Sequence, residues 1–124
     1  MLGKLVSVVD DDESVRESLP DLLRSYGLEV DAFSSAEAFL ESDNLARTDC
    51  LILDVAMPGM SGPELQQELV RRKHEIPIIF ITAHSDERTL PKVLRRGAVA
   101  CLFKPFSEAA LLETVNAALS RGGP

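Results

Sequence analysis

The sequence predicts an α/β fold, in which one parallel β-sheet is covered by helices on both of its faces. Short runs of Val, Ile and Leu recur five times along the chain, and segments with helical spacing of apolar residues lie between them. Because parallel strands need crossover connections, such alternation is typical of a doubly wound sheet. At 124 residues the chain is long enough for one domain of this kind.

The five apolar runs are the predicted strands. The first, third and fourth are almost continuous in apolar residues, which is typical of strands that are covered on both faces. The predicted strands are residues 5–9, 29–33, 50–53, 76–82 and 100–103.

The first and last helical segments have the clearest spacing. Apolar residues between Val15 and Tyr26 fall on one helical face, and those between Leu111 and Leu119 repeat the pattern. Pro20 lies off the apolar face of the first segment, so we expect a kink on the solvent side rather than a break.

Polar residues and glycines mark where the helices begin and end. Gly27 and Gly97 end two helical patterns at a position where a left-handed residue is favoured. Three Ser-x-x-Glu pairs fit the capping box, in which each side chain bonds the backbone N–H of the other residue. The predicted boxes are Ser14 with Glu17, Ser34 with Glu37, and Ser61 with Glu64.

Composition excludes several functional classes. A net charge of −7 argues against direct binding of nucleic acid by this domain. No apolar run reaches the roughly 20 residues that span a bilayer, and the first residues lack the long apolar stretch and the cleavage site of a signal peptide. We therefore expect a cytoplasmic protein without a membrane partner. Cys50 and Cys101 lie in apolar stretches and are interpreted as core residues, while His74 and His84 are too far apart to predict a metal site.

Chemically active side chains follow four of the five predicted strands. The first strand ends in three consecutive acids, and the third, fourth and fifth end in an acid, a hydroxyl and an amine. Since ligands bind beyond the carboxyl ends of parallel strands, we expect these groups to meet at one edge of the sheet. The residues are Asp10, Asp11, Asp12, Asp54, Thr82 and Lys104.

This combination predicts phosphoryl chemistry with a metal ion. Taken alone, each residue has an ordinary alternative, such as a helix cap or a solvated loop residue. Together, the carboxylates select Mg²⁺ or Mn²⁺, and a carboxylate can itself accept a phosphoryl group. The amine and the hydroxyl would neutralise and bind the phosphoryl oxygens. The sequence has no G-x-x-x-x-G-K-[ST] loop, so nucleotide hydrolysis fits poorly.

The three consecutive acids are not expected to be equivalent. We expect Asp11 to contact the metal directly. Asp10 is expected to act through a water molecule or by holding the groups that bind the metal. Asp12 is predicted to belong to the start of the first helix.

Four segments together resemble the receiver domain of two-component response regulators, the CheY-like superfamily, and in particular its FixJ-like branch. They are "VDDDESVR", "LILDVAMPGMSG", "IPIIFITAHSD" and "RRGAVACLFKPF", in the order and spacing of that family. The resemblance implies a (βα)5 sandwich with the flavodoxin-like strand order 2-1-3-4-5. It assigns residues 1–120 to the receiver domain and leaves 121–124 as a tail or the start of a linker.

The resemblance also implies a role for each site residue. Asp54 would accept a phosphoryl group from a sensor histidine kinase, and Lys104, joined to Pro105 by a cis peptide bond, would contact that group. Thr82 would carry the switch, together with the position of Cys101, where the family usually has an aromatic residue. The implied Mg²⁺ ligands, which Mn²⁺ could also use, are Asp10, Asp11, Asp54 and the backbone carbonyl of Ala56.

The implied function is a phosphorylation-dependent binding switch rather than a turnover enzyme, although the domain would assist its own phosphorylation and dephosphorylation. In a longer chain it would control a C-terminal DNA-binding domain and dimerise on phosphorylation. A stand-alone receiver and a phosphate-independent pseudo-receiver are the alternatives. The pseudo-receiver would be expected to lack at least one of the acid, Thr or Lys residues of the site, and this sequence has all of them. A haloacid-dehalogenase-type phosphatase would need an acid in place of Ala56.

Ala56 and His84 occupy the two positions near the site that vary most in the family, and Pro91 lies in the fourth helical region.

Overall fold

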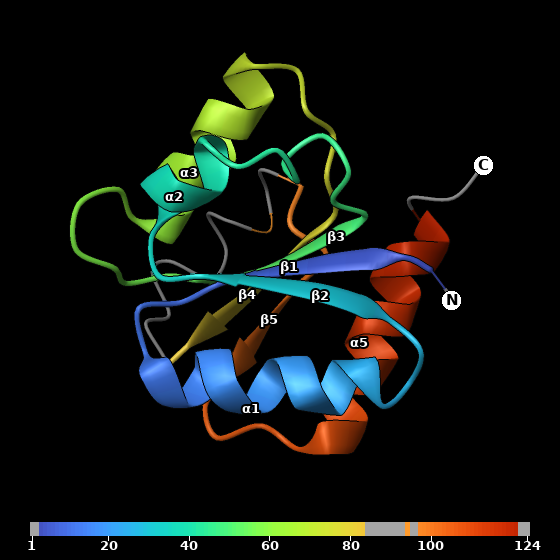
Figure 1. The fold of residues 1–124 in the computed structure, drawn as a ribbon. Helices are drawn as coiled ribbons and strands as arrows, with labels where there is room; N and C mark the ends of the chain where they lie inside the picture. Colours follow the sequence, from blue (N-terminus) through green and yellow to red (C-terminus); the bar gives the residue numbers. More distant parts are fainter. Residues whose placement is uncertain (1–2, 84–93, 95–96, 122–124) are drawn as a thin grey trace.

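Five parallel strands form a single sheet in the order β2-β1-β3-β4-β5, so the predicted fold class and strand order are confirmed (Figure 1). The structure is a computed structural model that describes residues 3–83, 94 and 97–121. The strands are β1 (Leu5–Val9), β2 (Glu29–Phe33), β3 (Cys50–Asp54), β4 (Ile78–Thr82) and β5 (Ala100–Phe103).

The predicted strand positions agree with the structure to within two residues. β4 begins at Ile78, two residues later than predicted, because Pro77 has no N–H to donate to a neighbouring strand. The carbonyl of Pro77 still accepts a hydrogen bond of 2.9 Å from the backbone N–H of Leu51. β3 extends one residue further than predicted and ends at Asp54 itself.

Four helices are described around the sheet, and none of them is long and apolar enough to cross a membrane. The helix expected between β4 and β5 lies outside the described residues, as do His84 and Pro91. The helices are α1 (Glu13–Arg24), α2 (Ala36–Leu40), α3 (Gly62–Arg71) and α5 (Glu108–Arg121).

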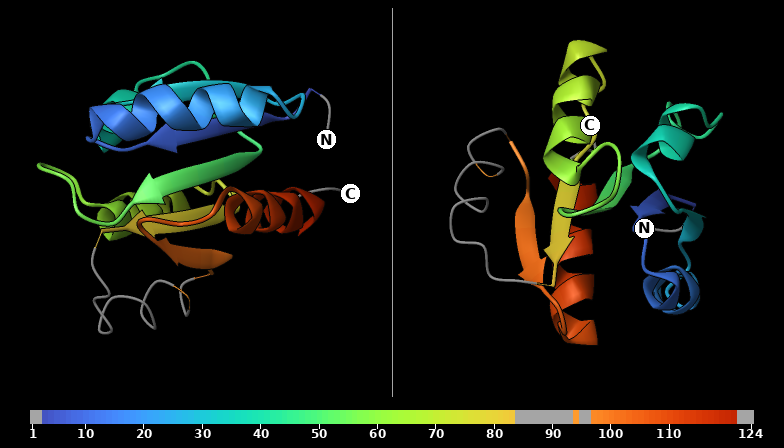
Figure 2. Two further views of the ribbon diagram at one scale, coloured as in Figure 1. Left: turned by 90° about the horizontal axis from the view of Figure 1, so that it is seen from below. Right: turned by 90° about the vertical axis from the view of Figure 1, so that its left-hand side faces the viewer.

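The two faces of the sheet are covered by different helices, as predicted for a doubly wound fold. α1 and α5 lie on one face and α2 and α3 on the other (Figures 1 and 2). β3 shows the alternation clearly, because Cys50 and Ile52 point to the α1 and α5 face while Leu51 and Leu53 point to the other. Each face therefore has its own hydrophobic core.

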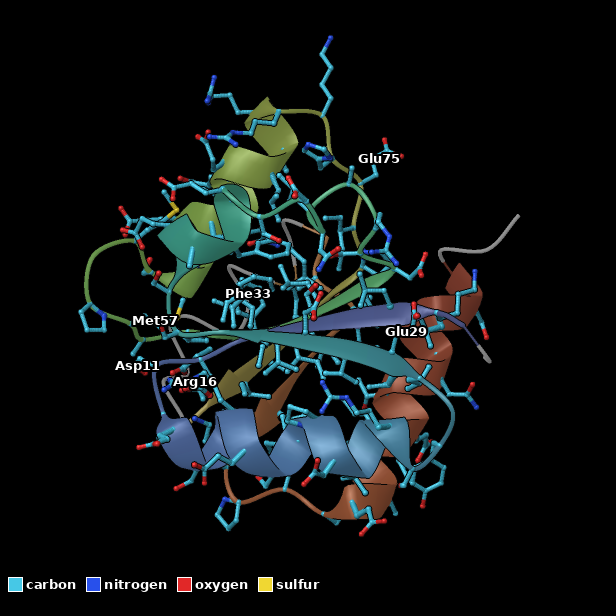
Figure 3. The ribbon with its side chains drawn as sticks, viewed as in Figure 1. Asp11, Arg16, Glu29, Phe33, Met57 and Glu75 are labelled. Atoms are coloured by element: carbon cyan, nitrogen blue, oxygen red, sulfur yellow. The ribbon has the colours of Figure 1, made fainter. Side chains whose placement is uncertain are left out.

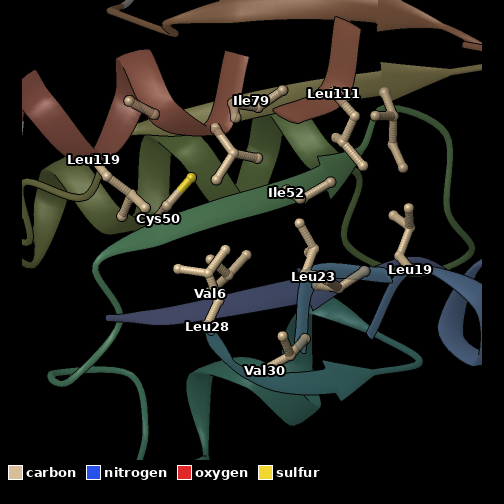
Figure 4. Close-up of a cluster of buried hydrophobic side chains, with 14 residues drawn as sticks. Val6, Leu19, Leu23, Leu28, Val30, Cys50, Ile52, Ile79, Leu111 and Leu119 are labelled. Atoms are coloured by element: carbon tan, nitrogen blue, oxygen red, sulfur yellow. The ribbon is translucent and has the colours of Figure 1, made fainter. Parts of the chain in front are cut away.

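The core beneath α1 and α5 is formed by buried side chains of both helices and four strands (Figure 4). Leu23 of α1 and Leu111 of α5 are fully buried there and meet the strand side chains between the helices. Cys50 is also fully buried in this core, which confirms its interpretation as a core residue.

Helix starts are where the sequence analysis was least accurate. The Ser61 and Glu64 capping box is present at α3, as predicted. α1 is instead capped by Asp12, which accepts the N–H of Ser14 at 2.9 Å, so the predicted box there is wrong but the predicted helix-start role of Asp12 is confirmed. α2 is capped by Ser35 rather than Ser34. Several neighbouring polar residues could serve as the N-cap of each helix. The residue that does so is the one whose backbone is extended directly before the first helical turn.

The expected solvent-side position of Pro20 is wrong, because this residue is buried. Pro20 precedes the buried Leu23 by three residues, a spacing that places the two side by side on the helix surface. The helix nevertheless runs unbroken from Glu13 to Arg24, as expected.

Candidate functional site

The polar residues predicted at the strand ends lie at the carboxyl edge of the sheet. β1, β3, β4 and β5 are consecutive in the sheet, so the residues at their ends are brought together although they are far apart in the sequence. Asp11, Arg16 and Met57 mark this end of the molecule in Figure 3, with Glu29 and Glu75 at the opposite end.

Three carboxylates meet at this edge. Asp10, Asp11 and Asp54 each offer an oxygen, and these oxygens lie within 4.8 Å of one another. Asp10 is 0% exposed and Asp54 is 5% exposed, while Asp11 is open to solvent. Acidic oxygen donors gathered in this way suit a hard divalent cation such as Mg²⁺.

Asp10 is held by several polar contacts. Its Oδ1 accepts the backbone N–H of Asp12 at 2.8 Å, and its Oδ2 accepts Nζ of Lys104 at 2.8 Å. Its backbone carbonyl accepts Nη1 of Arg16 at 2.9 Å. Both carboxylate oxygens of Asp10 therefore already have protein partners, whereas the carboxylate of Asp11 is exposed.

The electrostatics of Asp54 favour a cation. Burial raises the pKa of this carboxyl to about 7, and the neighbouring Asp10 adds to the increase. The ammonium of Lys104 and the backbone N–H of Ala56, which donates to the Asp54 carboxylate, act in the opposite direction. Two nearly buried carboxylates side by side resist being ionised together, so positive charge placed between them is strongly favoured.

Lys104 follows the edge strand β5, and its side chain reaches Asp10 directly after β1. Burial alone would lower its pKa, but the hydrogen bond and the charge of Asp10 outweigh this effect and hold the pKa above its usual value. The backbone N–H of Lys104 donates to the carbonyl of Thr82 at 2.8 Å, which fixes the start of the loop after β5. The Lys104–Pro105 peptide bond is cis, as the resemblance implies.

Thr82 and Cys101 lie on neighbouring strands near the site. Thr82 is buried at the end of β4, between β3 and β5 in the sheet. Cys101 is half-buried and packs against the core beneath α2 and α3, and burial raises the pKa of its thiol. Phe103 is 39% exposed, and Phe106 packs against the opposite core, so these two aromatic side chains do not replace the missing aromatic residue at Cys101.

Several residues near the site were not predicted. A Cβ on Gly62 would lie only 2.3 Å from the backbone oxygen of Asp54, so the first residue of α3 is pressed against the end of β3. Glu37 contacts the loop between β3 and α3, and Arg16 binds the carbonyl of Asp10. These contacts join residues that are distant in the sequence or depend on backbone proximity, and no local pattern indicates them.

Comparison with known proteins identifies the family. Residues 6–116 match the response regulator receiver domain. The chain belongs to the response regulator receiver family. Its relatives include nodulation protein W of Bradyrhizobium diazoefficiens, which is 50% identical over 117 residues, and the transcriptional regulatory protein FixJ of Azorhizobium caulinodans, which is 43% identical over 116 residues. Each alignment covers 94% of this chain, and 52% and 55% of the two relatives respectively.

A solved receiver structure has the same fold. The crystal structure of FixJ-N superposes with a TM-score of 0.88 and 38% sequence identity, covering 97% of this chain and 96% of that one. The curated relatives are about twice as long as this receiver, which spans roughly half of their length.

Proposed function

We propose that this receiver is a switch that is activated by phosphorylation of Asp54. The observation that carries the proposal is the contact of two nearly buried carboxylates, Asp10 and Asp54, beside the exposed Asp11 and the ammonium of Lys104. The carboxylates supply the ligands of a divalent cation and one nucleophile, and the lysine supplies a group that binds phosphoryl oxygens.

Phosphoryl transfer would proceed as an in-line displacement at phosphorus. A carboxylate oxygen of Asp54 forms the new O–P bond while the P–N bond of a kinase phosphohistidine breaks, and the imidazole nitrogen leaves with the electron pair. Mg²⁺ (or Mn²⁺ in its place), bound by Asp10, Asp11, Asp54 and the carbonyl of Ala56, would neutralise charge on the phosphoryl oxygens.

The other residues would position the new group and pass on its presence. Phosphorylated Asp54 offers additional acceptor oxygens to Lys104 and to the hydroxyl of Thr82, by analogy with other phosphorylated side chains. Movement of these two residues would bias the loops after β4 and β5 between two arrangements, and a partner that prefers one of them would bind more tightly. The small side chain of Ala56 leaves room for the water that returns Asp54 to its carboxylate.

The output is proposed to be binding rather than catalytic turnover. In a longer cytoplasmic protein, a DNA-binding domain would follow residues 121–124, and phosphorylation would promote a homodimer. The names of relatives such as the transcriptional regulatory protein FixJ support this output. Receivers that act alone, or without phosphate, are the alternatives.

The first experiment is phosphorylation with acetyl phosphate. Incubation with Mg²⁺ is expected to add the mass of one phosphoryl group to the wild-type chain, and EDTA or Asp54→Ala is expected to abolish this gain. Asp43→Ala removes an exposed acid away from the site and serves as the matched control. A wild-type chain that gains no mass, while a known receiver is labelled in parallel, would exclude the proposal.

A second experiment examines Lys104. We expect Lys104→Ala to slow phosphorylation by acetyl phosphate or to uncouple it from dimerisation, because the variant lacks the ammonium that faces the acidic residues. Rates are measured by intact mass and dimerisation by sedimentation. If both stay at the wild-type level, Lys104 has no part in the mechanism.

A further inference from the structure

Glu37 joins α2 to the loop that follows β3. Its Oε2 accepts the backbone N–H of Met60 at 3.1 Å, across 23 residues of sequence. The contact is not part of a helix cap, because Ser35 caps α2, while Ser61 and Glu64 form the capping box of α3. It is therefore a tertiary hydrogen bond, made by a charged side chain to the loop of residues 55–61.

Gly59 makes room for this hydrogen bond. Its φ of +73° lies in the left-handed region that glycine adopts most easily. A Cβ at this position would also lie 2.8 Å from Oε2 of Glu37. A side chain at residue 59 would therefore push the Glu37 carboxylate away from Met60, because the far end of a glutamate moves more easily than backbone.

The loop that Glu37 binds carries part of the candidate site. Its Ala56 N–H donates to the Asp54 carboxylate. At the ends of the loop, the N–H of Val55 donates to the carbonyl of Ile81 at 3.0 Å and the N–H of Gly62 donates to the carbonyl of Val55 at 3.0 Å. Glu37 contacts the loop between these two fixed ends.

We propose that Glu37 is a positioning residue for the phosphoacceptor site, which rests on the function proposed above. Its hydrogen bond to Met60 holds the loop so that the backbone groups of Ala56 stay beside Asp54. Without this hydrogen bond, the backbone groups of Ala56 adopt several positions relative to Asp54. The affinity for the metal is then lower and phosphoryl transfer to Asp54 is slower. The short helix α2, which contributes none of the predicted site residues, is by this route connected to the site.

The direct test compares Glu37→Ala with Glu37→Gln. The glutamine keeps a carbonyl oxygen that can accept the N–H of Met60, so it should rescue the alanine variant. The affinity for Mn²⁺, measured by electron paramagnetic resonance with Mg²⁺ as competitor, is expected to fall about tenfold in Glu37→Ala, the low end for residues that support metal ligands. Glu37→Gln is expected to stay within about twofold of wild type. Glu41→Ala, at the exposed C-terminal end of the same helix, is the matched control and should also stay within about twofold.

A double-mutant cycle with Gly59 separates positioning from general destabilisation. Gly59→Ala should displace the Glu37 carboxylate and so weaken Mn²⁺ binding as Glu37→Ala does. The double variant should bind Mn²⁺ about as weakly as Gly59→Ala alone, because the hydrogen bond can be lost only once. Amide hydrogen exchange at Met60 should be faster in all variants that lack the contact.

Each outcome decides for or against the proposal. Equal Mn²⁺ affinity in wild type and Glu37→Ala, equal losses in Glu37→Ala and Glu41→Ala, a glutamine variant as weak as the alanine variant, or additive losses in the cycle would overturn the positioning role. Failure of the wild-type chain to take up phosphate would overturn the proposed function instead, while metal binding and hydrogen exchange would still report on Glu37.

Discussion

The two faces of the sheet are built differently. On one face α1 and α5, helices of 12 and 14 residues, cover a continuous apolar core. On the other face α2 has only five residues, and its neighbour α3 begins with a glycine pressed against the backbone of Asp54. The first face therefore mainly stabilises the fold, whereas the second also holds the loop of the candidate site. Substitutions that separate stability from metal binding can test this division.

The largest expected effect is on stability alone. Leu111→Ala should lower the free energy of unfolding by about 2–5 kcal/mol, because it leaves a cavity in the core beneath α5. Urea unfolding measures the loss. Mn²⁺ affinity of the folded fraction should stay at the wild-type level, and a parallel loss of affinity would contradict the division between the faces.

Gly62→Ala should affect both properties. The added methyl group would lie 2.3 Å from the backbone oxygen of Asp54, so either α3 or the end of β3 must move, at a cost of about 1–3 kcal/mol. We also expect slower phosphorylation of Asp54 by acetyl phosphate at temperatures where the variant is fully folded. Gly97→Ala is a useful control. With a φ of +99°, the backbone at this position is strained by any side chain, but an added Cβ would have no atom within 4 Å.

Asp12 and Asp11 are adjacent but should respond in opposite ways. Asp12→Ala removes the cap of α1 and should cost about 1 kcal/mol of stability while leaving Mg²⁺ affinity unchanged. Asp11→Asn should retain stability and weaken Mg²⁺ binding, because it removes the exposed carboxylate of the cluster. Calorimetric titration and thermal unfolding of both variants, with Asp10→Asn alongside, provide the measurement. Equal loss of Mg²⁺ affinity from all three would show that the acids act as one group.

At Cys101 the expected effect is on the coupling between phosphorylation and output. Cys101→Phe restores the aromatic residue that is usual in the family at a half-buried position, and we expect it to change the coupling between phosphorylation and dimerisation more than the phosphorylation rate. Intact mass measures the rate, sedimentation measures the dimer, and Cys101→Ala is the control for packing. Identical behaviour of all three chains would make this position a packing residue only.

Features of the fold that follow from a general rule connecting sequence to position could be predicted from the sequence. Asp54 and Lys104 were expected near each other because the carboxyl ends of parallel strands share one edge, and in the structure both lie beside Asp10, close enough for their charges to interact. The rule needs only the strand ends and the strand order. The apolar runs of the strands were located for the same reason, since burial on both faces leaves a strong signal.

What was missed depends on distances that no local pattern contains. The competition between Asp12 and Ser14 for the cap of α1 is decided by one backbone conformation. The contact of Glu37 with Met60 joins two segments whose packing is set by the whole fold, and the closeness of Gly62 to Asp54 is a backbone contact without a side-chain signal. Glu37 fitted a local capping box, which hid its long-range partner.

The ion pair between Lys104 and Asp10 has a consequence for charge balance at the site. When all three clustered carboxylates are ionised, they and the one ammonium leave two negative charges, which a divalent cation cancels and a monovalent cation does not. Phosphorylation of Asp54 would add negative charge to this neutral set, since a phosphoryl group carries more than the single charge of a carboxylate. Under the proposed function, the ammonium of Lys104 would then face two anions, and a shift toward the phosphoryl group would weaken its ion pair with Asp10. The ammonium of Lys104, at the end of β5, would thus be shared between Asp10 after β1 and Asp54 at the end of β3, and the balance between these two contacts would depend on whether Asp54 is phosphorylated.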